Sequence, residues 1–86
     1  MITKGRERMY NILICDDERD IVSALKIYLE AEGYNTVLAY NGNEAVNAVK
    51  ENAVHLALMD IMMPECDGFT AMTKIREISN IPVSRI

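Results

Sequence analysis

The chain has 86 residues, of which 50% are hydrophobic and 26% are charged, and its formal net charge is −4. This composition is typical of one small globular domain and excludes a disordered tail or a collagen-like repeat. Direct binding of nucleic acid is not expected, because the chain is acidic and its basic cluster (Lys4, Arg6 and Arg8) lies at the extreme N-terminus. No apolar stretch approaches the ~18 residues of a membrane span. We therefore expect a protein that does not enter a membrane. Its two cysteines, Cys15 and Cys66, are too few to stabilise a small secreted fold, so we expect reduced thiols and a cytoplasmic protein.

The first predicted strand is the apolar run 11–15, which is followed by three acids, Asp16, Asp17 and Glu18. A run without polar alternation indicates a strand that is covered on both faces, as in a parallel sheet. We expect residues 1–8, which precede this strand, to be a disordered N-terminal extension.

The hydrophobic periodicity then alternates between helix and strand. It predicts, in chain order, a helix from about Arg19 to Gly33, a strand at 36–40, a helix after the Asn41-Gly42-Asn43 turn, a strand at 54–59 and a helix at 69–78. The asparagines of the turn can cap the helix that follows it. Residues 81–86 are similar to the beginning of a fourth strand. Three successive βα units favour an α/β fold with a parallel sheet and right-handed crossovers.

Acidic side chains follow two of the predicted strands. Asp16 and Asp17 come after the first strand and Asp60 comes after the third. If these strands are neighbours in a parallel sheet, the three carboxylates meet at its carboxyl edge, where ligands bind. Their mutual repulsion calls for a cation, and Mg²⁺ prefers such oxygen ligands. The alternative is that each acid only begins a solvated helix or loop, because Asp favours the first turn of a helix.

Four motifs together resemble the receiver domain of bacterial two-component response regulators. They are Cys15-Asp16-Asp17-Glu18, Met59-Asp60-Ile61-Met62-Met63-Pro64, Asp67-Gly68, and Asn41-Gly42 with Glu44-Ala45. The resemblance runs from about Met9 to Pro82. It implies a flavodoxin-like (βα)5 fold that is cut short here after three βα units and the start of strand four, with strand order 2-1-3-4. Residues 9–86 would then be an incomplete receiver domain, from a parent protein that is a DNA-binding transcriptional regulator.

The resemblance also implies a chemistry for the acids. Asp60 would be the phosphoacceptor, taking a phosphoryl group from a sensor histidine kinase. Asp16, Asp17, Asp60 and the backbone carbonyl of Met62 would hold Mg²⁺. The family's hydroxyl residue at the end of strand four and lysine at the end of strand five have no counterpart in this sequence, since Ser84 comes too early. We therefore expect a signalling module, not an enzyme, and do not expect efficient switching.

Two other functions are alternatives to the receiver interpretation, and the second of them lacks a residue that it requires. A non-switching interaction fragment would bind a kinase or pair with other receivers, and an exposed edge of an incomplete sheet predicts such self-association. An aspartyl-phosphate hydrolase would need a second acid two residues after Asp60, where this chain has Met62. His55 is predicted to be a structural or surface residue and not a catalytic one, because it lies at the opposite end of its strand from Asp60.

Overall fold

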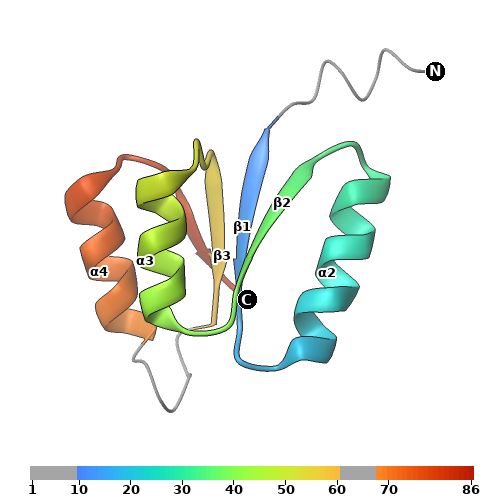
Figure 1. Ribbon diagram of the computed structural model, residues 1–86, viewed down its shortest axis with the longest axis horizontal. Helices are drawn as coiled ribbons and strands as arrows, with labels where there is room; N and C mark the ends of the chain where they lie inside the picture. Colours follow the sequence, from blue (N-terminus) through green and yellow to red (C-terminus); the bar gives the residue numbers. More distant parts are fainter. Residues whose placement is uncertain (1–9, 61–67) are drawn as a thin grey trace.

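The computed structural model describes residues 10–60 and 68–86, which form one parallel sheet with helices on both of its faces (Figure 1). The strand order is β2-β1-β3-β4, and all three pairings are parallel. This confirms the predicted α/β fold, its strand order and the start of a fourth strand. The elements are β1 (Asn11–Cys15), α2 (Arg19–Ala31), β2 (Asn35–Ala39), α3 (Gly42–Glu51), β3 (Leu56–Met59), α4 (Gly68–Ile78) and β4 (Val83–Arg85).

Two local signals fix the ends of helices. The Asn41 side chain accepts a hydrogen bond from the backbone N–H of Glu44 across 2.9 Å, so Asn41 caps α3 as its sequence position predicts. Gly33, which follows α2, has a φ of 94°, a conformation that glycine adopts without steric cost. Both signals are local to the chain, and this is why the sequence predicts these boundaries.

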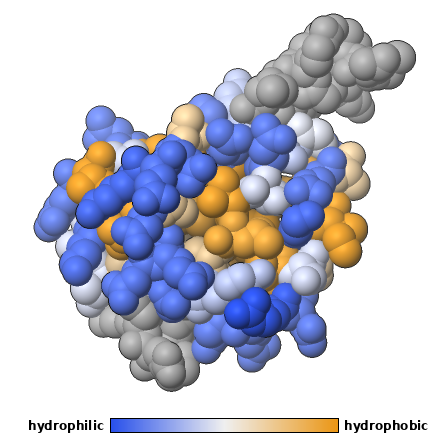
Figure 2. Space-filling model, in the orientation of Figure 1, coloured by the Kyte–Doolittle hydropathy of each residue, from blue (hydrophilic) through white to orange (hydrophobic). Residues whose placement is uncertain are grey.

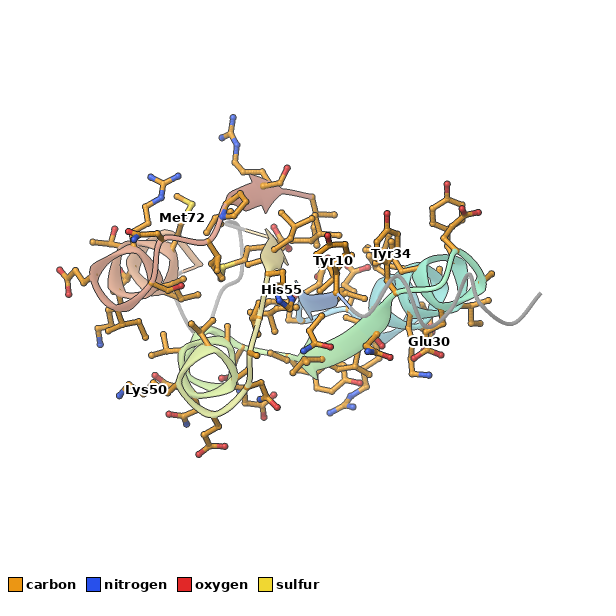
Figure 3. All side chains as sticks on the ribbon, turned by 90° about the horizontal axis from the view of Figure 1, so that it is seen from above. Tyr10, Glu30, Tyr34, Lys50, His55 and Met72 are labelled. Carbon is orange, nitrogen blue, oxygen red and sulfur yellow. The ribbon has the colours of Figure 1, made fainter. Side chains whose placement is uncertain are left out.

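The third strand is shorter than predicted. Val54 and His55 lie before β3, which starts at Leu56. At this position the His55 N–H donates to the carbonyl oxygen of Asn11 across 2.8 Å, and the His55 Nδ1 accepts a hydrogen bond from the Asn11 N–H across 2.9 Å. The ring also lies edge-on to Tyr10, with 5.3 Å between the ring centroids. Figure 3 shows these two side chains next to each other at this end of the sheet.

The larger part of the core lies between the sheet and the helices α3 and α4, which pack against each other. Figure 3 shows these two helices on one side of the sheet and α2 on the other. The core residues on the α3 and α4 side include the fully buried Leu13, Met59 and Ile75. Each buried side chain of this size stabilises the fold by about 1.5–3 kcal/mol.

The face of the sheet under α2 is more thinly covered. Val22 is the buried residue of α2, whereas Ile27 and Tyr28 are 70% and 62% exposed. Figure 2 also shows hydrophobic side chains at the surface in the middle of its view, between α3 and α2. None of the helices in the described part of the chain has the length and apolar character needed to cross a lipid bilayer.

Candidate functional site

The structure brings together the three carboxylates that the sequence places after strands. One oxygen of each of Asp16, Asp17 and Asp60 lies within 4.8 Å of the other two. The sheet explains this convergence, because Cys15 and Met59 are paired in the parallel register of β1 and β3. The residues that follow them leave the sheet side by side.

Backbone hydrogen bonds anchor this edge on both sides of β1. The N–H of Asp60 donates to the carbonyl oxygen of Cys15 across 2.9 Å, and the N–H of Asp16 donates to that of Ala39 across 3.2 Å. The ends of β2, β1 and β3 are thereby tied to one another. The acidic residues are thus held by the sheet itself and do not depend on a long loop for their position.

The three acids differ in their exposure to solvent. Asp16 is only 2% exposed, Asp60 is half-buried and Asp17 is exposed. Asp16 Oδ1 accepts a hydrogen bond from the N–H of Glu18 across 3.0 Å. A carboxylate that is half-buried at the mouth of such a cluster can be reached from solvent, whereas Asp16 forms the floor of the site.

Burial raises the pKa of the Asp16 carboxyl, and the neighbouring carboxylates of Asp60 and Asp17 raise it further. The hydrogen bond from the Glu18 N–H opposes this shift, since it favours the charged form. The site therefore concentrates negative charge in a place where solvent screens it poorly. Binding of a proton or a cation relieves this repulsion.

The donor set fits a hard divalent ion. Mg²⁺ and Ca²⁺ bind oxygen ligands at about 2.0–2.6 Å, so two ligands of one ion can lie up to roughly 4–5 Å apart. The carboxylate oxygens of Asp16, Asp17 and Asp60 fall within this span. An exposed ligand such as Asp17 leaves room for the water molecules that Mg²⁺ retains. The fourth predicted ligand, the carbonyl of Met62, lies outside the described residues.

One contact beside the acids has no signal in the sequence. The guanidinium carbon of Arg19, the first residue of α2, lies 3.9 Å from the centroid of the Tyr40 ring. Tyr40 directly follows β2, and its N–H donates to the Glu44 carboxylate across 2.8 Å. A cation–π contact of this kind stabilises by about 0.5–1 kcal/mol at exposed sites. No spacing rule connects positions 19 and 40, because their contact depends on how α2 packs against β2.

Comparisons with known proteins agree with this geometry. The family model "Response regulator receiver domain" matches residues 12–86. The transcriptional regulatory protein YvrH of Bacillus subtilis (strain 168) is 47% identical over 74 residues, which are 85% of this chain and 31% of YvrH.

Two solved structures illustrate the similarity in three dimensions. The response regulator TrrA from Thermotoga maritima, in complex with Mg²⁺-BeF, has a TM-score of 0.80 and 34% identity, over 87% of this chain and 66% of that one. The receiver domain of Ssk1, co-crystallised with the histidine phosphotransfer protein Ypd1 of Saccharomyces cerevisiae, has a TM-score of 0.77 and 34% identity. That match covers 85% of this chain and 50% of the other.

The chain spans about a third of the length of the curated relatives that it matches. Within that span, the family match runs from the second residue of β1 through β4 and includes all three clustered carboxylates. The strand order, the acidic cluster and the family match all agree. The chain therefore belongs to the response regulator receiver domain family.

Proposed function

We propose that this chain accepts a phosphoryl group on Asp60, with Mg²⁺ bound by the neighbouring carboxylates. The observation that carries the proposal is the convergence of Asp16, Asp17 and Asp60 at the carboxyl end of β1 and β3. Asp60 is half-buried, so its carboxylate is accessible to a donor while its backbone is held by Cys15. Its two neighbours supply the remaining charge of a cation site.

The proposed reaction is a transfer between two side chains. An oxygen of the Asp60 carboxylate attacks the phosphorus of a phosphohistidine in line with the P–N bond, which breaks, and the imidazole leaves with that electron pair and takes up a proton. The product is an aspartyl phosphate. Bound Mg²⁺ would neutralise charge on the equatorial phosphoryl oxygens. Asp16 and Asp17 would hold the ion, and the Asp60 backbone would keep the nucleophile in place.

The similar proteins support this proposal. TrrA was crystallised with Mg²⁺-BeF, and the receiver domain of Ssk1 with a histidine phosphotransfer protein. For this chain we propose a sensor histidine kinase as the phosphoryl donor. We further propose a cytoplasmic location, a transcriptional regulator as the parent protein and a signalling role without turnover of a substrate.

Incubation of the chain with acetyl phosphate and Mg²⁺ tests the proposal. Intact-mass spectrometry should detect one added phosphoryl group, which disappears in Asp60→Asn and is retained in Asp20→Asn. Asp20 is a suitable control because it is exposed in the first turn of α2. A folded chain that gains no phosphoryl group would instead favour the interaction fragment that binds a kinase without being modified.

A further inference from the structure

A groove of about 240 Å³ runs between α3 and α4, separate from the acidic cluster. Its lining residues are polar or basic apart from Val46: Asn43, Asn47 and Lys50 come from α3, and Lys74 comes from α4. None of the described residues that line it is acidic. This is a local concentration of positive charge on a chain whose formal net charge is −4.

The two lysines of the groove are not neutralised by the rest of the described chain. Among the described residues, an ion pair joins Lys26 and Glu30 of α2 at 3.0 Å, and neither Lys50 nor Lys74 pairs with any described residue. Lys26 has an acid four positions later in α2, whereas no acid lies four positions before or after Lys50 or Lys74. Glu77 lies three positions after Lys74, but the two side chains form no ion pair among the described residues.

We propose that this groove, called the α3–α4 groove below, binds the carboxylates of an acidic segment of a partner protein. Lysine ammonium groups attract carboxylates, and the Asn43 and Asn47 amides can donate hydrogen bonds to the same oxygens. Figure 3 shows Lys50 extending from α3 on the side away from the sheet, where a partner can reach it.

The size of the groove favours a protein segment over a small molecule. Pockets that enclose a small ligand usually have volumes of about 300–1,000 Å³, and the α3–α4 groove is smaller and open to solvent. Such a groove has room for one or two side chains whose backbone stays outside. Glu or Asp side chains on an extended segment meet this requirement, with Val46 contacting their methylene groups.

A titration of the ¹⁵N-labelled chain with a hexaglutamate peptide tests the proposal, with hexaglutamine as the uncharged control. Hexaglutamate should shift the amide resonances of α3 and α4 around the groove, and hexaglutamine should not. Lys50→Gln combined with Lys74→Gln should weaken binding roughly tenfold, since it removes both charges that attract the peptide. The matched control, Arg76→Gln combined with Arg85→Gln, removes the same charge from exposed positions outside the groove and should leave the affinity unchanged.

Three outcomes would overturn the inference. The control pair could weaken binding as much as the groove pair, which would mean that only net charge matters. The shifts could lie outside α3 and α4. Inorganic phosphate could displace the peptide and bind as tightly, which would make this a site for a small anion. Circular dichroism of each variant confirms that it is folded, and none of these measurements requires phosphorylation of Asp60.

Discussion

The backbone N–H of Asp60 donates to the carbonyl oxygen of Cys15 across 2.9 Å, so the residue that follows β3 is held next to the last residue of β1. This bond continues the ladder in which Cys15 pairs with Met59. The proposed nucleophile and the buried Asp16 are therefore positioned by the same sheet edge, and the consequences of this fold can be measured along with its proposed chemistry.

Replacing Asp16 by Asn should stabilise the chain when no divalent ion is present. Two unit charges about 4 Å apart repel by about 1 kcal/mol even in water, and Asp16 is buried beside Asp17 and Asp60. We expect the free energy of unfolding in urea with EDTA to rise by roughly 1 kcal/mol in Asp16→Asn. Asp20→Asn, at an exposed position on α2, should change it by less than about 0.5 kcal/mol. Equal stabilisation by both variants would contradict this explanation.

The effect of Asp16 on stability should depend on pH in a defined direction. The pKa of Asp16 is raised above its ordinary value of 3.8 in the folded chain, mainly by burial. The folded state therefore binds a proton on Asp16 more tightly than the unfolded state does. Protonated Asp16 stabilises the folded chain at low pH, and this stabilisation is lost as the pH rises through the raised pKa. In EDTA, the stability advantage of Asp16→Asn should be small below pH 3.8 and grow towards neutral pH. If the stability advantage of Asp16→Asn instead shrinks as the pH rises, the raised pKa of Asp16 does not explain it.

A matched pair of isoleucines in α4 tests where the core lies. Ile75 is fully buried and Ile78 is 47% exposed, although both lie in the same helix. Ile75→Ala should reduce the free energy of unfolding by about 2–5 kcal/mol, enough to unfold much of a chain this small. Ile78→Ala should reduce it by less than about 1 kcal/mol. Urea unfolding followed by circular dichroism measures the free energy of unfolding of both variants. Similar losses in the two variants would mean that α4 does not bury Ile75 against the sheet.

The Asn41 cap of α3 should contribute measurably to the stability of the folded chain. Asn41→Ala removes the oxygen that accepts the Glu44 N–H, and we expect a loss of about 1 kcal/mol. Asn80→Ala provides the control, because Asn80 is exposed after the end of α4. Thermal unfolding of the two variants gives the comparison, and an unchanged midpoint in Asn41→Ala would show that the cap is dispensable.

Local patterns predicted most of this fold, and contacts distant in sequence explain what they missed. The alternation of periods predicted three βα units and the Asn41 cap, because each of these depends on residues close in the chain. The late start of β3 was missed, and at this point the Asn11 N–H bonds the side chain of His55, which lies 44 positions away in the chain. In the site, the convergence of the three acids was predicted because the carboxyl ends of neighbouring parallel strands meet at one edge of the sheet. The contact between Arg19 and Tyr40 was not predicted, because it depends on how α2 packs against β2. The prediction for residues 1–8 concerns a segment outside the described residues.

Self-association through the sheet edge stays a prediction that one variant can test. β4 is the last strand of the described sheet, and its inner side pairs with β3 through Pro82 O and Ile86 N. Hydrogen-bonding groups alternate along a strand, so the N–H of Arg85 points outward. Arg85→Pro removes this outward donor, whereas Arg85→Gln keeps it. Light scattering at micromolar concentration should detect dimers of the chain and of Arg85→Gln but monomers of Arg85→Pro. A monomeric parent chain would contradict the prediction.

The most direct test of the account is a Mg²⁺ titration of the ¹⁵N-labelled chain. The account predicts saturable shifts of the amide resonances of Asp16, Asp17 and Asp60, and their loss in Asp17→Asn. Resonances of Tyr10 and His55, at the other end of the sheet, should stay in place. If the three aspartate resonances do not move at millimolar Mg²⁺ while the chain is folded, the carboxylates do not form a cation site and the proposed phosphoryl transfer loses its basis.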